Sequence, residues 1–265
     1  MIYGLYLSAT GVIANSHKQD VVANNLANAE TAGFKRDLPT FKQRLTEAEQ
    51  RRTAGGPKSW SDATLEGLGG GLFVAPSRSD LSQGSFEQTG APLDVAIEGK
   101  GFFAVQKANG SAATGDPALL TRNGQFMLDR EGYLTLANEA GHRVLDADRQ
   151  PIKLDTGSTA KLAVARDGTL SNDGKPLARI GVFNVADPGK LTKAGGTIMG
   201  YADAGGLTKS DATVRGGFAE RSNVDPTVEL TELMRTQRLL EANANIIRTQ
   251  DQTLAKLVNE VGKIS

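Results

Sequence analysis

Few residues of this chain have the type and spacing that a metal site needs. The two histidines, His17 and His142, lie far apart in the sequence, and there is no cysteine. Zinc takes three or four nitrogen, sulfur or carboxylate ligands, so we expect no zinc centre. Asp146 and Asp148 alternate as in a calcium loop, but Pro151 stands where such a loop turns on glycine. The sequence therefore predicts no metal ligands.

Two glycine-rich stretches fall short of the motifs that bind nucleotides. Gly99-Lys100-Gly101 precedes an apolar strand, but no third glycine opens a helix, as the dinucleotide motif requires. Residues 55–59, GGPKS, have proline where a phosphate loop has glycine before its lysine. No nucleophile with a base and an orienting group can be assembled either. We therefore expect no enzyme activity and no cofactor.

Composition excludes two further classes of protein. The 30 Lys and Arg residues balance the 30 Asp and Glu residues, which leaves no broad charge for binding nucleic acid. No apolar run approaches the roughly 18 residues of a membrane span, and the N-terminus lacks a basic signal region. We expect neither nucleic-acid binding nor direct membrane insertion, and any export would use a route other than a cleaved signal peptide.

The N-terminal residues follow a heptad pattern, which predicts a helix. Mostly apolar residues, with the polar Ser16 and Gln19 among them, recur at alternating intervals of three and four, at Ile2, Leu5, Ala9, Val12, Ser16, Gln19, Ala23 and Leu26. Gly33 stands where a helix C-terminal glycine would, and Lys35 and Arg36 follow it to complement the helix dipole. We expect a helix over residues 1 to about 32 that stops at Gly33.

The C-terminal residues repeat this pattern over a longer stretch. Asp225 and Pro226 predict the start, with the aspartate as N-cap and the proline at the first helical position. The heptad positions are Leu230, Leu233, Gln237, Leu240, Ala244, Ile247, Asp251, Leu254, Val258 and Val261. Such a helix would be on the order of 55 Å long. That length exceeds one face of a compact globule of this size, so part of the helix is expected to pack elsewhere.

Two interpretations of the helices remain open. They could form an antiparallel pair within one chain, or they could also present their heptad positions to other copies. Polar residues in the pattern cost stability but can fix register and partner. Asn24, Asn25 and Asn28 are poor helix formers near the end of the first helix. We interpret them as side chains that need hydrogen-bond partners from neighbouring subunits.

Between the helices the pattern changes to short strands. Apolar segments over residues 73–216 alternate with hairpin dipeptides at Glu131-Gly132, Asp167-Gly168 and Asp173-Gly174. Residues 51–71 have no periodicity and are expected to be a long loop or a partner-ordered segment. The predicted fold class is α+β, with long N- and C-terminal helices forming a coiled-coil core and with a central antiparallel β-rich domain. The expected parts are an N-terminal helix (1–35), a linker (36–72), a β domain (73–216) and a C-terminal helix (217–265).

Four stretches together resemble the flagellar rod and hook axial protein family of bacteria. Their order and spacing match over nearly the whole chain, in NNLANAETAGFKR (24–36), PLDVAIEGKGFFAV (92–105), TRNGQFMLDREGYL (121–134) and RSNVDPTVELTELMRTQRLLEANANIIRTQDQTL (221–254). The length and the single β domain resemble a rod subunit. Leu239 and Leu240 depart from the family, which commonly has an aromatic residue there.

The resemblance implies a structural subunit of the basal-body rod, the periplasmic drive shaft that carries motor torque to the hook. The terminal helices would polymerise into the inner core of a helical tube, and the β domain would lie outside. The implied partners are other copies, neighbouring rod and hook subunits and the flagellar type III export apparatus. Two other functions stay open: a hook or hook-associated subunit, or a β-rich binding module on a coiled-coil stalk.

Residues of both helices are expected to pack between subunits, and three more to end or start a helix. In the N-terminal helix they are Leu5, Val12, Gln19, Asn24, Asn25, Leu26 and Asn28. In the C-terminal helix they are Leu230, Leu233, Gln237, Leu240, Ala244, Ile247, Asp251 and Leu254. The stop is Gly33, and the start is Asp225 with Pro226.

Overall fold

The structure is a computed structural model that describes residues 2–45, 49, 71–107, 118–138, 141–154 and 162–261. Apart from Gly71, the loop expected over residues 51–71 lies outside these ranges. The chain divides into two compact units. We call residues 1–26, 37–78 and 225–265 the helical unit, and residues 27–36 and 79–224 the β unit.

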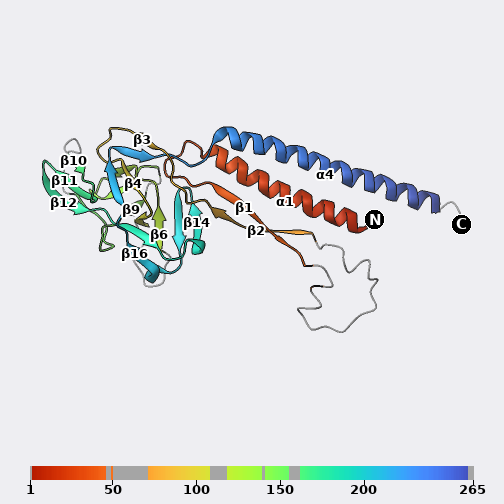
Figure 1. The fold of residues 1–265 in the computed structure, drawn as a ribbon, viewed down its shortest axis with the longest axis horizontal. Coiled ribbons are helices and arrows are strands. Elements are labelled where there is room, and N and C mark those ends of the chain that lie inside the picture. Colours follow the sequence, from red (N-terminus) through yellow and green to blue (C-terminus); the bar gives the residue numbers. More distant parts are fainter. Residues whose placement is uncertain are drawn as a thin grey trace. The chain divides into compact units, whose positions relative to one another are not determined.

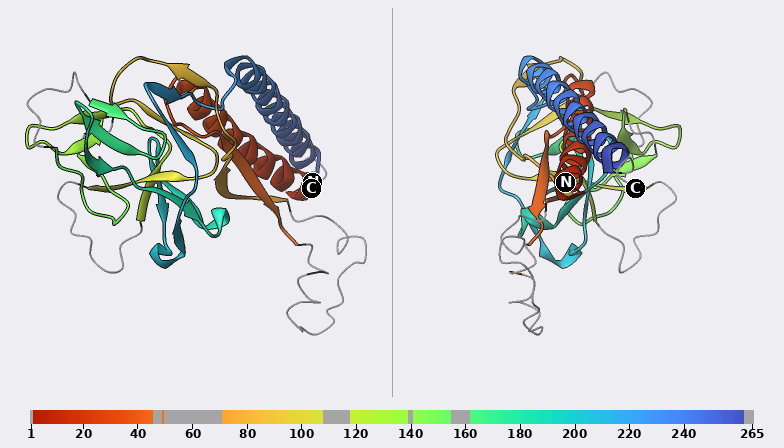
Figure 2. Two further views of the ribbon diagram at one scale, coloured as in Figure 1. Left: turned by 60° about the vertical axis from the view of Figure 1, so that its left-hand side comes forward. Right: turned by 90° about the vertical axis from the view of Figure 1, so that its right-hand side faces the viewer.

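The helical unit holds both long helices. They are α1 (Ile2–Ala27) and α4 (Pro226–Val261), and they run antiparallel, side by side, in the views of Figures 1 and 2. A two-stranded sheet of β1 (Asp37–Gln43) and β2 (Leu72–Ser79) completes the part of this unit that the structure describes. Strand β1 lies in the segment that the sequence predicted as a linker.

The start of α4 follows from its first residues. The Asp225 carboxylate accepts hydrogen bonds from the backbone N–H groups of Thr227 (2.8 Å) and Val228 (3.3 Å). These are two of the donors that a helix N-terminus leaves without an intrahelical partner, and Pro226 has no N–H to satisfy.

The end of α1 differs from the prediction. The helix ends at Ala27, and residues 28–33 form turns in which Thr31 N donates to Asn28 O (3.1 Å). Gly33 has a φ of 70°, and a Cβ there would lie 2.2 Å from the backbone nitrogen of Asn123. Glycine is therefore needed because two backbone segments approach closely, and Gly33 is not the helix stop that was expected.

The β unit consists of short strands joined by turns. Its strands are β3 (Phe86–Gln88), β4 (Val95–Glu98), β5 (Phe102–Lys107), β6 (Ala118–Thr121), β7 (Phe126–Leu128), β8 (Leu134–Leu136), β9 (His142–Val144), β10 (Leu162–Val164), β11 (Thr169–Asn172), β12 (Lys175–Arg179), β13 (Val182–Val185), β14 (Leu191–Gly195), β15 (Ile198–Tyr201), β16 (Leu207–Lys209), β17 (Thr213–Gly216) and β18 (Phe218–Glu220). Two 3₁₀ helices, η1 (Pro188–Lys190) and η2 (Ala204–Gly206), lie between them.

The largest sheet has nine strands and is antiparallel. Seven of them follow the order β14-β15-β6-β5-β9-β8-β7, and β13 pairs with both β5 and β16. The register places Phe103 opposite Thr121 and Val105 opposite Val144. Smaller sheets pair β10-β11-β12, β17-β4 and β18-β3. The predicted α+β class with antiparallel sheets is confirmed.

Strand β5 separates two apolar cores. Phe103 and Val105 belong to one cluster of buried side chains, and Phe102 and Ala104 belong to another. Successive residues of a strand point to opposite faces of a sheet, so β5 is buried on both sides. The β unit thus has the apolar burial that a self-supporting fold needs.

Candidate assembly surface

The helical unit has little apolar core of its own in the part that the structure describes. Its buried hydrophobic residues there are Ala14, Val21, Val22 and Ala75, and each of the three clusters of buried hydrophobics belongs to the β unit. The fully buried residues of α4 are polar: Glu229 and Thr236, both 0% exposed. Over the described residues, the two long helices therefore bury few apolar side chains completely.

A stripe of polar residues on α4 includes two amide side chains that meet α1. Glu229, Thr236, Asn243 and Gln250 are spaced seven residues apart along α4. A Cβ added at Gly11 would lie 3.2 Å from Asn243 Nδ2, and one at Gly4 would lie 2.8 Å from Gln250 Nε2. The contact between the helices thus consists, at these levels, of amide side chains against glycine.

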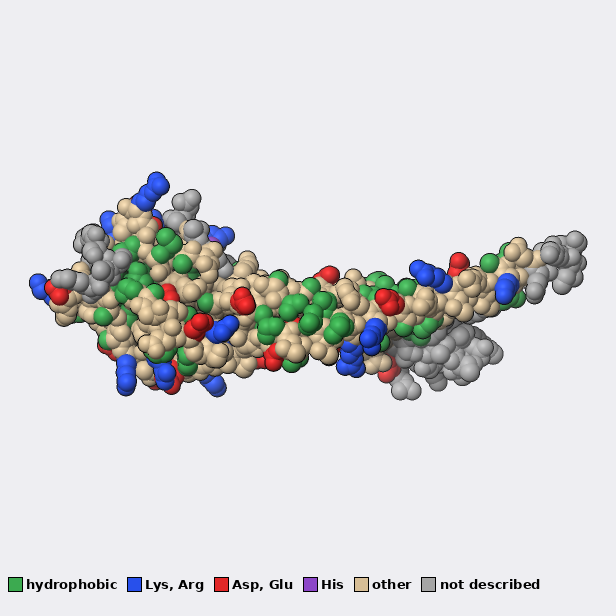
Figure 3. Space-filling model, turned by 90° about the horizontal axis from the view of Figure 1, so that it is seen from above, with side chains coloured by type: hydrophobic (Ala, Val, Ile, Leu, Met, Phe, Trp, Pro, Cys, Tyr) green, Lys and Arg blue, Asp and Glu red, His purple; other side chains and the backbone are tan. Residues whose placement is uncertain are grey.

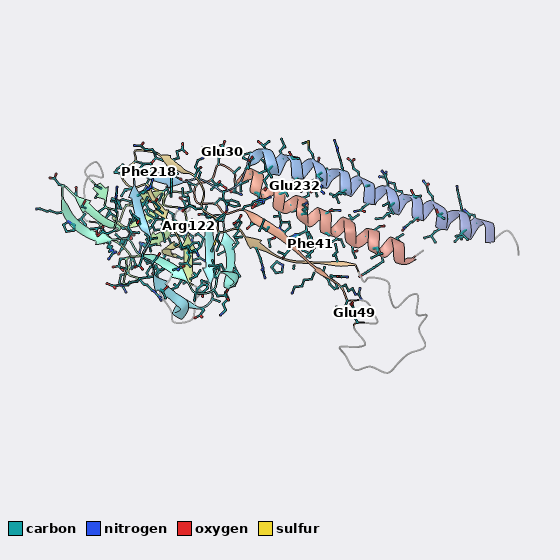
Figure 4. All side chains as sticks on the ribbon, viewed as in Figure 1. Glu30, Phe41, Glu49, Arg122, Phe218 and Glu232 are labelled. Atoms are coloured by element: carbon teal, nitrogen blue, oxygen red, sulfur yellow. The ribbon has the colours of Figure 1, made fainter. Side chains whose placement is uncertain are left out.

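One ion pair joins the two helices. Lys18 Nζ donates to Glu232 Oε2 at 2.7 Å, and each side chain is about a quarter exposed (27% and 28%). Figure 4 labels Glu232 on the side of α4 that faces α1. The hydrogen bond from Lys18, and then its charge, lower the pKa of the Glu232 carboxyl.

The residues that were expected to pack between subunits differ widely in exposure. Partly buried on α4 are Leu233, Leu240, Ala244, Ile247 and Leu254, whereas Leu230, Gln237 and Asp251 are exposed. On α1 and the turn after it, Leu5, Val12, Gln19, Leu26 and Asn28 are partly buried, Asn24 is exposed and Asn25 is buried. The structure holds a single chain, so packing between subunits stays a prediction.

Large hydrophobic side chains are exposed along the helical unit. Seventeen are exposed among the described residues, and all but Met127 and Leu177 belong to this unit. On α4 they are Val228, Leu230, Met234, Leu239, Ile246, Leu257 and Val258; the rest are Tyr6, Leu7, Ile13, Leu38, Leu45, Leu72, Phe73 and Val74. Figure 3 shows hydrophobic side chains at the surface along α4.

Four of the exposed residues of α4 share one face. Val228, Leu239, Ile246 and Leu257 follow one another at intervals of two or three helical turns. Beside them lies a groove of about 310 Å³ lined by Thr231, Met234, Arg235, Arg238 and Leu239. Large exposed apolar patches on a protein mark interaction sites, which makes this face of α4 a candidate. We call this face of α4 and the groove beside it the assembly surface.

Asn25 and Asn28 make contacts within the chain. The Asn25 amide donates to Asp37 O (2.9 Å) and accepts from Asp37 N (2.8 Å), which joins the end of α1 to the start of β1. The Asn28 side-chain oxygen accepts from Thr31 Oγ1 at 3.2 Å. The interpretation that these asparagines need partners from neighbours is therefore wrong for Asn25, whose side chain is satisfied and buried.

The β unit contains a buried ion network that the sequence patterns did not reveal. Glu220 accepts from Lys35 Nζ (2.6 Å) and from Arg122 Nη1 (3.2 Å), and the three side chains are 0–5% exposed. Lys35 also donates to Ser82 O (2.7 Å), and Arg122 donates to Gly99 O (2.8 Å). Figure 4 labels Arg122 within the β unit. The prediction that Lys35 complements a helix dipole is wrong.

Burial dominates the electrostatics of the two cations. It lowers the pKa of the Lys35 amine and of the Arg122 guanidinium, and the attraction of Glu220 opposes both shifts. No single motif could predict the network, because its three charges come from segments that lie far apart in the sequence. Each charge does lie in, or next to, one of the stretches quoted above.

The described residues also bear on metal binding and on membrane insertion. Within the described ranges, no group of three or more His, Asp or Glu side chains is arranged to hold a metal ion. Neither α1 nor α4, over the residues described, has a stretch apolar and long enough to cross a membrane.

Three family models match separate parts of the chain. They are the flagella basal body rod protein model on residues 5–35, the flagellar hook protein FlgE/F/G D1 domain on residues 96–172, and the flagellar basal body rod FlgEFG protein C-terminal model on residues 215–260. The match to residues 5–35 covers most of α1, and the match to residues 215–260 covers most of α4. The middle match holds the greater part of the large sheet.

Similar proteins are aligned over almost the full chain. The flagellar basal-body rod protein FlgG of Bacillus subtilis strain 168 is 33% identical, with 98% of this chain and 99% of the relative covered. The rod protein FlgF of Caulobacter vibrioides is 31% identical, with 98% of each covered. The flagellar hook-basal body complex protein FlhO of Bacillus subtilis is 30% identical, with 100% of each covered.

Proposed function

The chain belongs to the family of flagellar basal-body rod proteins, and we propose that it builds the rod by packing its assembly surface against other copies and neighbouring flagellar subunits. It is a structural subunit of the bacterial flagellar basal-body rod. The observation that carries this function is the match to rod proteins over 98% of the chain. These names favour the rod over the hook and over a stalked binding module.

The distribution of apolar surface supports packing through the helices. Burying a leucine or isoleucine side chain fully stabilises a protein by roughly 1.5–3 kcal/mol. The exposed residues of α4 include three leucines, an isoleucine, two valines and a methionine, none of which contributes this much in one chain. The Lys18–Glu232 pair between the helices is partly exposed and contributes only about 0–1 kcal/mol. The helical unit would therefore gain most of its stability on assembly.

The two kinds of surface on α4 suit different tasks. The amides of Asn243 and Gln250 lie against Gly11 and Gly4, and polar residues in a helix contact can fix which level of α1 meets which level of α4. The apolar face is non-directional and can supply the energy of contacts between subunits. We propose that the terminal helices form the coiled-coil inner core of a helical tube, and that the β unit lies outside it.

An open-ended tube needs one contact repeated by a screw operation that does not close into a ring. Such a tube would serve as the periplasmic drive shaft that carries torque to the hook. A helical unit that is stabilised mainly by its neighbours also suits passage through the flagellar type III export channel, since little has to be unfolded first.

Charges placed on the assembly surface test the proposed packing. Leu239 and Ile246 are 43% and 46% exposed, so Leu239→Glu with Ile246→Glu should leave the free chain about as stable as before. In a strain that lacks its own copy, we expect the wild-type chain to restore rods and motility and the double variant to restore neither. Rods are counted in isolated basal bodies by electron microscopy.

The matched control is Gln252→Glu, which adds a charge at an exposed polar position of the same helix. It should restore rods as the wild-type chain does. Normal rods built from the double variant would show that this face of α4 does not pack between subunits.

A further inference from the structure

One amide side chain ties together three segments of the β unit at the points where the chain leaves it. The chain passes between the units after residues 26, 36, 78 and 224. Asn223 Oδ1 accepts from Arg36 N at 2.8 Å, and its Nδ2 donates to Asp80 O at 2.9 Å. Asp80 N in turn donates to Arg36 O at 2.8 Å. Arg36 and Asn223, which precede the crossings after residues 36 and 224, are thus bonded to each other and to Asp80, which follows the crossing after residue 78.

The buried ion network forms a second layer beneath this amide. Glu220 joins the same three segments, because it accepts from Lys35 Nζ (2.6 Å) and from Gly84 N (3.0 Å). Its backbone carbonyl accepts from Gly33 N at 2.8 Å. We call residues 33–36, 80–84 and 220–223 the exit joint.

The exit joint is anchored in the large sheet. Arg122 follows directly on β6, which lies between β5 and β15, and it bonds Glu220. A chain of hydrogen bonds therefore runs from Asn223 through Ser82 O and the Lys35–Glu220 pair to Arg122, at the end of a central strand. Asn223 is the outermost member and is only partly buried, whereas Lys35, Glu220 and Arg122 are buried.

We propose that Asn223 is a positioning residue that fixes the spacing of the three segments, so that load on the helical unit passes into the sheet. This inference rests on the proposed rod function. At three of the four crossings, torque carried along the chain between the units passes through these segments. An amide suits the position because it both donates and accepts, whereas a carboxylate can only accept.

The isosteric variant Asn223→Asp tests this role. It keeps an acceptor for Arg36 N but cannot donate to Asp80 O or to Ser82, whose backbone and hydroxyl oxygens lie 3.2 and 2.9 Å from Nδ2. Hydrogen exchange of the full-length chain is measured by residue. The amides of Arg36 and Asp80 should exchange at least 10-fold faster, and those of β5 and β6 should be unchanged.

The second readout is rotation under load in the strain that lacks its own copy. With Asn223→Asp, rods should assemble in normal number, but rotation in a viscous medium should slow at least two-fold relative to the wild-type chain. The control Asn138→Asp changes the same group in the same unit, where the amide donates to the Gln125 side chain at 3.2 Å. It should match the wild type in both readouts.

Several results would overturn the inference. Unchanged exchange at Arg36 and Asp80 would show that the amide does not hold the segments. Faster exchange together with wild-type rotation would show that Asn223 does not help to transmit load. If the variant built no rods, the exit joint would be needed for assembly of the rod and not for bearing torque. If even the wild-type chain restored no rods, the proposed function would fail, and the exchange result alone would decide whether Asn223 positions the segments.

Discussion

At the scale of single residues, the buried ion network costs stability but fixes how three segments of the β unit are arranged. Lys35, Arg122 and Glu220 place two cations and one carboxylate in the interior of the β unit. Removing such charges from water costs several kcal/mol per ion, and their attraction recovers this only with good geometry and added hydrogen bonds. Backbone groups of Ser82, Gly84 and Gly99 supply those bonds. The network therefore depends on every member being present.

Removing the carboxylate should be severely destabilising. Glu220→Gln leaves Lys35 and Arg122 as buried cations without their counter-charge. Breaking a buried pair by removing one partner costs about 3–5 kcal/mol. We expect the free energy of unfolding of the β unit to fall by about this amount. Denaturant unfolding, followed by far-ultraviolet circular dichroism of the strands, measures the loss.

The matched control is Glu98→Gln, which makes the same change in an exposed pair of the same unit. Glu98 accepts from Arg215 Nε at 2.8 Å, but the side chains are 46% and 41% exposed. Exposed pairs contribute about 0–1 kcal/mol, so this variant should lose no more than that. Equal losses in the two variants would contradict the assigned cost of the buried charges.

At the scale of elements, the pairing of α1 with α4 depends partly on pH. The pKa of Glu232 is lowered in the folded chain by the hydrogen bond and charge of Lys18. Below its ordinary pKa the unfolded state then binds more protons than the folded state, so stability rises with pH. The contribution of the pair is present above about pH 4.5 and is lost as pH falls through the lower pKa of the folded state.

The variant Lys18→Met should therefore reduce helix content at pH 7 and have no such effect at pH 3. At pH 7 the loss should correspond to about 0.2–1 kcal/mol, because both side chains are about a quarter exposed and screened by solvent. Ellipticity at 222 nm during denaturant unfolding measures it. The control Lys42→Met removes an exposed lysine of β1 in the same unit and should show no step with pH. An equal loss at both pH values would contradict the pairing.

Local rules predicted some elements and missed others. The start of α4 follows from Asp225 and Pro226 alone, and hairpin dipeptides such as Asp173-Gly174 mark turns between strands. The end of α1 does not follow locally, because the turns after Ala27 are held by Asn28 and by the contact of Gly33 with Asn123. Strand β1 was missed because its pairing with β2 joins segments separated by the loop region.

The candidate surface was predicted in kind but not in detail. A heptad pattern shows that a helix has an apolar stripe, but it does not tell which stripe meets the helix of the same chain. Here the amides of Asn243 and Gln250 meet α1. Within the predicted pattern, Leu230 is exposed, whereas Leu233, Leu240 and Leu254 are partly buried. The ion network was beyond prediction, because a lysine after a helix looks the same in sequence whether it is solvated or buried.

At the scale of the whole molecule, apolar burial is distributed unevenly between the two units. The β unit has clusters around Phe103 and Phe102 on the two faces of β5. The helical unit, over its described residues, has four buried hydrophobic residues, none larger than valine. Ordering a backbone costs about 1–2 kcal/mol per residue, and only burial and hydrogen bonding can offset this. The two units should therefore differ in stability within one free chain.

Hydrogen exchange of the dilute full-length protein measures this difference directly. Local opening free energies range from near zero in poorly packed segments up to the global value in core strands. We expect amides of α1 and α4 to exchange at least 100-fold faster than those of β5 and β6, and to become protected when the chain is incorporated into rods. An opening that is 100-fold more populated corresponds to about 2.7 kcal/mol less stability. Equal protection in the free chain would mean that the polar stripe and the Lys18–Glu232 pair suffice to hold the helices, and the proposed gain of stability on assembly would then be wrong.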